Sequence, residues 1–350
     1  MTIIQTTEPN LKAWDAYVLQ HPHSNPYLLS GWSRAVSSAY GHKIYQLMTT
    51  DTAGNATGVL PLVHIKHPIF GNTLFSMPYA DLGGVIADDE QTATALIEQA
   101  TQIASDIKIP TIELRQGSEL KINTSSYHQS AAGANKVRMV LDLPDTADEL
   151  MAGFKAKLRS QIRRPQKDGL TTVTGGIELL DDFYRVFAEN MRDLGSPVHA
   201  KKFIAAVITE FADRVRITTV RKGQEVYAAG ITLGCAGTLY NPWASSLRRY
   251  SASSPNMLLY WSMLEHACEN SYATFDFGRS TPEEGTWKFK KQWGTVETPL
   301  HWLSLTQAPV PHASQAQQKS TFDVAMQLWQ KMPVALSKVV GPPLRKYIGL

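Results

Sequence analysis

The order of apolar and polar positions along the chain predicts two successive halves, each built from helices and strands. In the first half, apolar residues recur at helical spacing over residues 10–20, 28–40 and 90–108. Strand-like runs rich in β-branched and aromatic residues fall at 43–49, 58–66, 74–85, 111–115 and 137–143. This order indicates a mixed α/β layer arrangement.

The second half repeats the alternation. One long helix is predicted from the acidic stretch at 145–150 through Arg164, ending before Pro165. Further helices are expected at 183–194, 201–211 and 255–269, the last with Pro255 in its first turn and a capping Ser254. Strands are expected at 215–221, 226–233, 238–244 and 272–277. A chain of 350 residues is long enough for two domains.

The stretch from 271 to 294 is the most unusual in pattern. A strand is followed by a polar loop from Arg279, and the chain then alternates aromatic and lysine residues. If this segment is extended, Trp287 and Phe289 share one face and Lys288 and Lys290 the other. Fixed ammonium groups beside an arginine would stabilise negative charge that develops in a reaction. The competing interpretation is a half-buried strand with solvated lysines.

The predicted helix before Pro165 carries a second unusual pattern. Between residues 155 and 167 there are six cations and no acid, so the repulsion along the helix is not relieved by ion pairs. Arg159 and Arg163 lie on one side of this helix. We expect an anionic partner such as phosphate groups, and the alternative is a solvated face.

Composition and charge exclude several classes of protein. A net charge of +3 does not by itself indicate nucleic-acid binding, and no DNA partner is expected. The two cysteines lie far apart, which is typical of free thiols in a reducing compartment. The histidines match no metal-site spacing, so no metal is expected. The absence of a signal-peptide pattern and of a long apolar run predicts a cytoplasmic protein.

The order of elements in the second half resembles the GNAT acyltransferase core. In that core, the loop between a strand and the following helix presents amide groups to the pyrophosphate of the donor. The corresponding loop, 245–254, contains no glycine and lacks the usual coenzyme A signature. Arg248 and Arg249 in this loop could still hold an anion.

Several motifs together resemble the Fem peptidyltransferase-related family and its BioF2-type domains. They are K-L-R-S-Q-I-R-R-P-Q-K at 157–167, N-P-W-A-S-S at 241–246, P-N-M-L-L-Y-W at 255–261, F-D-F-G-R-S at 275–280 and F-K-K-Q-W-G at 289–294. The longer strings, including N-M-R-D-L-G-S-P at 190–197, are similar to Fem-like proteins associated with exosortase/PEP-CTERM and exopolysaccharide gene sets. The first half resembles the family through S-G-W at 30–32 and Y-A-D-L-G-G at 79–84.

The resemblance implies an α/β (α+β) fold of tandem GNAT-like domains with mixed sheets flanked by helices. The expected division is an N-terminal domain over 1–140, an acyltransferase domain over 141–305, and a linker with amphipathic helices over 306–350. Fem enzymes transfer an aminoacyl group from aminoacyl-tRNA to an amine, using a Phe-Lys pair that corresponds to Phe289 and Lys290. The long helical hairpin that several members use with tRNA is absent from this sequence, so the donor stays open between aminoacyl-tRNA and acyl-coenzyme A.

These observations predict an N-acyltransferase that acts on a cell-envelope or exopolysaccharide precursor without a tightly bound cofactor. Lys290 and Arg279 are expected to stabilise the oxyanion, with Asp276, Tyr240 and His199 as candidate general bases. The expected substrate-binding residues are Phe289, Trp243, Arg248, Arg249, Arg159, Arg163 and Trp287. The competing class is a non-catalytic module that binds an anionic glycan or nucleotide-sugar.

The tail after residue 306 carries apolar positions at helical spacing together with lysines and arginines. Two interpretations remain open for it: packing on the main body, or contact with the inner face of a membrane.

Overall fold

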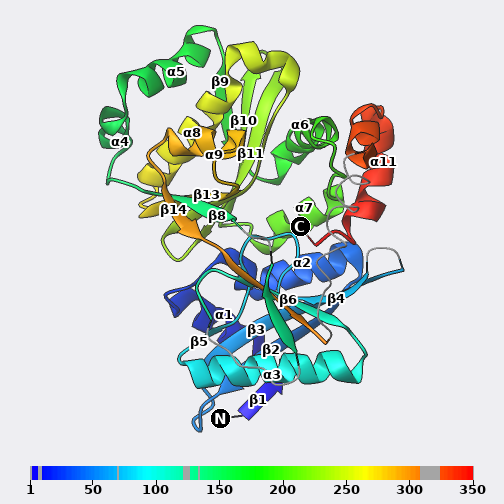
Figure 1. The fold of residues 1–350 in the computed structure, drawn as a ribbon. Helices are drawn as coiled ribbons and strands as arrows, with labels where there is room; N and C mark the ends of the chain where they lie inside the picture. Colours follow the sequence, from blue (N-terminus) through cyan, green and yellow to red (C-terminus); the bar gives the residue numbers. More distant parts are fainter. Residues whose placement is uncertain are drawn as a thin grey trace. The chain divides into compact units, whose positions relative to one another are not determined.

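The computed structural model describes residues 2–6, 10–68, 71–120, 127–132, 135–307 and 324–349. The chain forms two compact units, each with its own sheet (Figure 1). The first unit comprises Met1–Lys136, Pro299–Ser314 and Lys346–Leu350, and the second comprises Val137–Thr298 and Gln315–Arg345. The mixed sheets flanked by helices confirm the predicted fold class.

The sheet of the first unit has the order β1-β2-β3-β4-β6-β15-β7, with β5 beside β3. Its strands are β1 (Thr2–Gln5), β2 (Lys43–Thr50), β3 (Ala56–His67), β4 (Gly71–Phe75), β5 (Ile86–Ala87), β6 (Thr111–Gln116), β7 (His128–Ala131) and β15 (His301–Thr306). Helix α3 (Glu90–Asp106) packs its apolar stripe on one face, and α1 (Leu11–Gln20) and α2 (Ser30–Tyr40) cover the other.

The sheet of the second unit has the order β14-β8-β13-β12-β11-β10-β9. Its strands are β8 (Val137–Asp142), β9 (Thr171–Gly175), β10 (Val215–Lys222), β11 (Glu225–Cys235), β12 (Thr238–Ser246), β13 (Thr274–Ser280) and β14 (Val296–Pro299). The helices are α4 (Ala147–Gly153), α5 (Ala156–Lys167), α6 (Leu180–Asp193), α7 (Lys201–Glu210), α8 (Pro255–Glu269), α9 (Gly285–Lys291) and α11 (Val334–Arg345).

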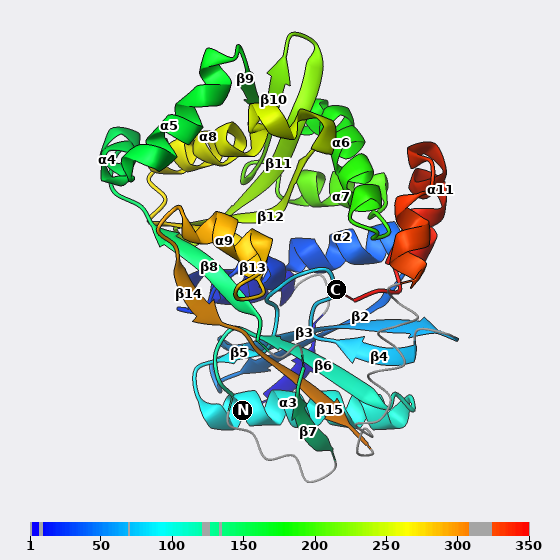
Figure 2. The ribbon, with the colours of Figure 1, turned by 45° about the horizontal axis from the view of Figure 1, so that its top comes forward.

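Helix α8 is the centre of the larger core of this unit. Eleven of its fifteen residues are buried, because it lies between the sheet and helices α4 and α5. Figure 2 shows α8 along one face of the sheet and α6 and α7 along the other. A helix that is apolar on most sides is expected only where it is enclosed by other elements.

Several sequence expectations need correction. The stretch 285–291 is helix α9 rather than an extended segment, so Trp287 and Phe289 do not share a face with Lys288 and Lys290 opposite. The long helix predicted up to Pro165 is two helices, since Phe154 and Lys155 are extended, with ψ of 148° and 146°. Pro165 lies inside α5, near its end.

Two corrections concern strands and one a cap. The predicted strand 74–85 ends at Phe75 in β4, and the chain then turns through positive φ at Tyr79 (64°) and Gly83 (138°). Strand β15, assigned from sequence to the second domain, pairs with β6 of the first sheet. Ser254 precedes α8 in a left-handed conformation and its side chain makes no capping hydrogen bond.

The C-terminal residues reach both units. Helix α11 packs against α6 of the second unit. The following residues belong to the first unit, where the carbonyl of Gly349 accepts from the Tyr79 amide at 3.0 Å. His42 Nε2 lies 2.8 Å from the carbonyl oxygen of Lys346. Among the helices in the described part of the chain, none combines the length and apolarity that crossing a membrane requires.

Candidate active site

Strands β12 and β13 run in parallel but pair over only three residues. Their register joins Thr238 to Thr274 and ends with Tyr240 beside Asp276. On its other side β13 is antiparallel to β8, and the register passes from Asp276 opposite Val140 to Arg279 opposite Arg138. The chain therefore advances by three residues on β13 and by only two on β8. Such an extra residue in one strand is a β-bulge. Gly278 lies in this bulge with φ of 76°, where a glycine avoids strain.

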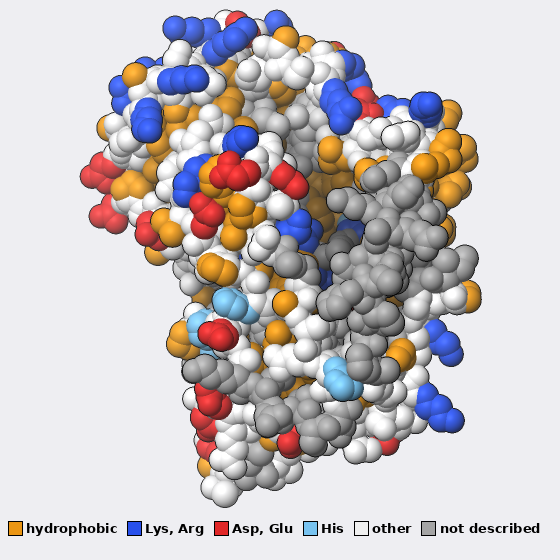
Figure 3. All heavy atoms as spheres, in the orientation of Figure 1, with side chains coloured by type: hydrophobic (Ala, Val, Ile, Leu, Met, Phe, Trp, Pro, Cys, Tyr) orange, Lys and Arg blue, Asp and Glu red, His pale blue; other side chains and the backbone are white. Residues whose placement is uncertain are grey.

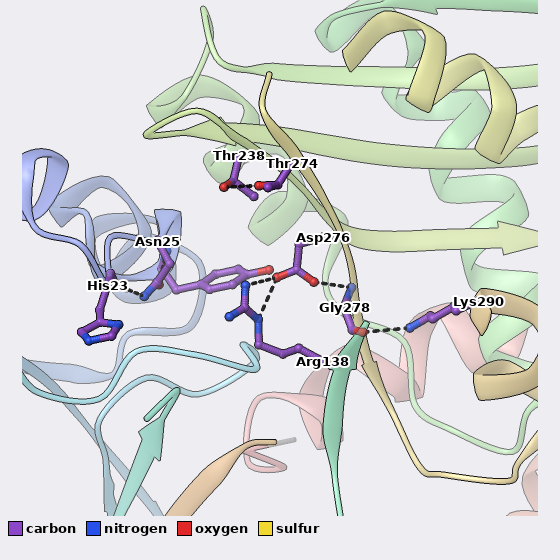
Figure 4. A network of polar contacts seen from close by, with 9 residues as sticks. His23, Asn25, Arg138, Thr238, Thr274, Asp276, Gly278 and Lys290 are labelled. Carbon is purple, nitrogen blue, oxygen red and sulfur yellow. Dashed lines mark hydrogen bonds and ion pairs between the residues drawn. The ribbon is translucent and has the colours of Figure 1, made fainter. Parts of the chain in front are cut away.

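The bulge is held by a buried ion pair. Arg138 donates from Nε and Nη2 to Asp276 Oδ2 at 2.9 and 2.7 Å, and the other oxygen of Asp276 accepts from the Gly278 amide at 2.7 Å (Figure 4). The Asp276 side chain is only 4% exposed. A carboxylate with both oxygens engaged is fixed in position, and it fixes the backbone of the bulge in turn.

Lys290 is hydrogen-bonded to the backbone of the same bulge. Its ammonium group donates to the carbonyl of Gly278 at 3.1 Å and to that of Arg279 at 2.7 Å (Figure 4). Lys290 is 8% exposed, so α9 directs a cation into the protein rather than into solvent. Two backbone carbonyls compensate for part of its desolvation. The arrangement presents a positioned positive charge at the point where β12 and β13 stop pairing.

Aromatic rings surround this part of α9. Phe289 lies edge-on to Tyr260 of α8, with ring centroids 5.0 Å apart, and Trp293 is within 6.3 Å of Tyr260. Phe277 of β13 stacks on Tyr260 at 5.3 Å. An apolar surrounding strengthens electrostatic interactions of a nearby charge. Trp287 packs against the edge of the same core, with Lys291 Nζ 5.8 Å from its ring.

Two of the candidate bases, Tyr240 and His199, differ in their surroundings. Burial, and then the charge of Asp276, raise the pKa of Tyr240, so its hydroxyl stays protonated at neutral pH. His199 is 2% exposed and its Nε2 accepts from Arg345 Nε at 3.1 Å. Burial, followed by the charge of Arg345, lowers the pKa of His199 well below its usual value. In this arrangement, the imidazole nitrogen that could act as a base already accepts a hydrogen bond.

The expected substrate-binding residues of β12 and its loop have local partners. Trp243 packs against Phe203 and His199, with ring centroids 6.0 and 6.4 Å apart. Arg249 forms an ion pair with Glu189 and lies 4.9 Å from the Tyr250 ring. Arg248 and Arg249 are both exposed, and Arg249 is already engaged by Glu189.

The cations of the basic helix α5 fall into two groups, one bound to the local backbone and one exposed. Arg159 Nη1 donates to the carbonyls of Ala152 and Phe154 at 3.1 and 2.6 Å, closing the end of α4. Arg163 is exposed, as are the remaining cations of this stretch, Lys155, Lys157, Arg164 and Lys167. Figure 3 shows Lys and Arg side chains gathered over α5. The helix thus carries an exposed basic face, with Arg159 serving the local fold.

Arg138 is the residue that sequence reasoning did not identify. The strand V-R-M-V-L-D was predicted, but its arginine was not singled out. A single cation between apolar residues of a strand is a weak signal for a buried carboxylate partner. Its partner Asp276 lies 138 positions away, so the pair could not be assigned from spacing. Within the described residues, no three His, Cys, Asp or Glu side chains are grouped so that they could hold a metal ion.

The chain is similar to several known proteins. Residues 152–291 match the family described as Acetyltransferase (GNAT) domain. The chain is 22% identical over 371 residues to a lipid II:glycine glycyltransferase of Staphylococcus epidermidis, covering 80% of this chain and 87% of that protein. The crystal structure of FemX superposes with a TM-score of 0.66 at 16% identity, covering 87% of this chain and 97% of that one. The C-terminal domain of a putative lysylphosphatidylglycerol synthetase from Agrobacterium fabrum superposes with a TM-score of 0.55 at 12% identity, covering 92% and 95%.

The match over residues 152–291 and the similarity to glycyltransferases indicate that this protein is an acyltransferase. The similarity to a lipid II:glycine glycyltransferase extends over 80% of the chain, and the likeness to the FemX structure shows a common fold. The enzyme prediction is therefore confirmed, and the non-catalytic binding module is set aside.

Proposed function

We propose that this acyltransferase transfers an aminoacyl or acyl group to an amine of a cell-envelope precursor, with Lys290 stabilising the oxyanion. The observation that carries the proposal is the fixed ammonium of Lys290 on the carbonyls of Gly278 and Arg279, inside the matched GNAT region. A preorganised cation stabilises charge that develops in the transition state without reorganising during the reaction.

The proposed step is a direct transfer. The acceptor nitrogen attacks the carbonyl carbon of the donor, the C–N bond forms, and the carbonyl oxygen gains negative charge beside Lys290. Collapse of the tetrahedral intermediate breaks the bond to the leaving group, a ribose oxygen of tRNA or the sulfur of coenzyme A. The amine proton leaves to solvent, in keeping with the protonated state of Tyr240 and the engaged nitrogen of His199.

Two donors are compatible with these residues. Aminoacyl-tRNA is favoured by the relationship to glycyltransferases and by the exposed basic face of α5. Acyl-coenzyme A is the donor suggested by the GNAT match alone, and exposed Arg248 would meet its phosphates. We take aminoacyl-tRNA as the first donor to test.

The acceptor is proposed from two lines of support. The similarity to lipid II:glycine glycyltransferases favours a lipid II-type precursor. The motif resemblance to exosortase/PEP-CTERM-associated proteins favours an exopolysaccharide precursor instead. Both are amine-bearing or glycan-linked molecules assembled at the cytoplasmic face of the membrane, which is where we propose that the enzyme works.

The deciding experiment is a transfer assay with the purified full chain. A mixture of radiolabelled aminoacyl-tRNAs and, separately, acetyl-coenzyme A is offered with a lipid II preparation as acceptor. The expected result is label in the lipid fraction from one donor, and its loss with Lys290→Met. Transfer that is unaffected by Lys290→Met would remove the proposed role of the lysine.

A further inference from the structure

Helix α11 packs on the second unit through small and polar residues and leaves apolar residues exposed. The face packed against the second unit carries Ser337, Gly341 and Arg345, which are all buried. A Cβ atom at Gly341 would lie 3.0 Å from the Val198 amide nitrogen, so the contact depends on a small residue. Arg345 completes this face by donating to His199. The helix therefore docks through small and polar residues, whereas a surface helix normally buries its apolar stripe.

The opposite face of α11 is apolar and accessible. Leu336 and Val339 are 47% and 70% exposed. The helical turns just before α11 add Val324 and Leu328, which are 55% and 66% exposed. Figure 3 shows hydrophobic side chains gathered over this part of the second unit. Leu194, at the end of α6, is also exposed, and its neighbour Gly195 lies against Met326. These five residues, Leu194, Val324, Leu328, Leu336 and Val339, form the apolar C-terminal face.

The charged residues of the C-terminal segment itself all have one sign. Residues 324–349 contain no Asp or Glu and four cations, Lys331, Lys338, Arg345 and Lys346. Of these, Lys331 and Lys338 are exposed, and Lys338 Nζ lies 5.8 Å from the ring of Tyr184 in α6. An amphipathic surface that combines exposed aliphatic side chains with lysines suits the boundary between acyl chains and anionic headgroups.

We infer that the apolar C-terminal face docks on the surface of an anionic membrane. A second copy of this chain fits the surface less well, because a symmetric contact would bring the same lysines together, and the neighbouring acid Asp193 is already paired with Arg192. The inference deepens the proposed function, since a lipid-linked acceptor would then be met at the membrane surface. Binding to lipid does not depend on the acceptor or on Lys290, so the two proposals can fail separately.

The test is sedimentation of the full chain with phosphatidylcholine vesicles, with and without phosphatidylglycerol. We expect binding to the vesicles that contain phosphatidylglycerol, weakening as salt is added. The double substitution Leu336→Ser with Val339→Ser should reduce vesicle affinity roughly tenfold or more, since it removes two aliphatic side chains from the contact. Lys331→Gln with Lys338→Gln should lower it by roughly fivefold per charge.

The matched control is Val173→Ser with Ile177→Ser. These two residues are 40% and 51% exposed on the same unit but lie outside the C-terminal segment. Their substitution should leave vesicle binding unchanged, and thermal unfolding should show that all variants are folded. Equal binding by the Leu336/Val339 variant and the control would overturn the inference. So would a dimer in sedimentation equilibrium that the same variant abolishes, without any vesicle binding. Transfer to a soluble amine should be unaffected in this variant.

Discussion

Arg138 and Asp276 lie 138 positions apart, yet two nitrogens of the arginine contact a single oxygen of the aspartate. The other oxygen of Asp276 holds the Gly278 amide, and the Gly278 carbonyl accepts from Lys290. A continuous series of charge-assisted hydrogen bonds thus leads from β8 through the bulge of β13 to the ammonium of α9. Each member restrains the next, so the position of Lys290 depends on residues that need not touch substrate.

Lys290→Met should lower turnover by about 100-fold or more, because the loss of one preorganised donor removes stabilisation specific to the transition state. The carbonyls of Gly278 and Arg279 also lose a donor, so we expect a stability loss of about 1–3 kcal/mol. Steady-state transfer kinetics and urea unfolding check both effects. Lys288→Met is the control, since Lys288 is exposed on the same helix. Equal and small effects of the two substitutions on turnover would contradict the assignment.

Asp276→Asn should destabilise the second unit by about 3–5 kcal/mol, because it leaves Arg138 largely buried without its charge partner. Chemical unfolding measures this loss. If the pair acts through Lys290, the turnover of the folded Asp276→Asn enzyme should fall while KM for the acceptor changes little. Arg138→Met combined with Asp276→Asn should recover part of the stability. Recovery of stability together with full turnover would show that the pair serves the fold alone.

Substitutions on α5 should separate binding from folding. Arg163→Glu reverses an exposed charge, so it should weaken binding of a phosphate-bearing donor and flatten its salt dependence while stability stays within about 0.5 kcal/mol. Arg159→Glu removes the donor to the Ala152 and Phe154 carbonyls and should also destabilise the fold. Filter binding of aminoacyl-tRNA across a salt series, with circular dichroism, tests the difference. Unchanged binding by Arg163→Glu would return α5 to the role of a solvated face.

Stability should decrease as pH falls below the ordinary histidine pKa of about 6.5. Burial lowers the pKa of His199 in the folded protein, so below that pH the unfolded chain binds a proton that the folded protein excludes. His199→Gln should flatten the decrease. Burial also lowers the pKa of His21, His42 and His266, so some dependence should remain in this variant. Urea unfolding at pH 7.5 and at lower pH checks the sign, and a steeper decrease in His199→Gln would contradict it.

Gly83→Ala should destabilise the first unit by about 1–3 kcal/mol or more. Gly83 has φ of 138°, and a Cβ atom there would lie 2.4 Å from Met77 Cβ. Gly153→Ala is the matched control, because no atom lies within 4 Å of its Cβ position and its φ is not positive. Thermal unfolding of the two variants provides the comparison. A loss in Gly153→Ala as large as that in Gly83→Ala would show that the clash is not its cause.

Local pattern determined most of the helices and strands of this protein. Hydrophobic periodicity predicts helix α3 and strands β2, β3, β10 and β11. Each of these elements is long enough for the helical period to be distinguished from the period of a strand. The basic face of α5 could likewise be read from six cations without an acid. The motifs that resemble Fem proteins led to the acyltransferase class, which the comparisons confirm.

Tertiary structure decided what short or distant patterns could not. The alternation at 287–293 fits a strand, but Phe289 and Trp293 are also four residues apart, and packing of both against Tyr260 favours the helical turn of α9. The sequence of β15 does not identify β6 as its partner strand. The pairing depends on which sheet edge is available in the folded protein. The contact of Arg138 with Asp276 likewise exists only because β8 and β13 are neighbours in the sheet. Burial and distance are properties of the folded chain, so local sequence determined the elements and tertiary packing determined the site.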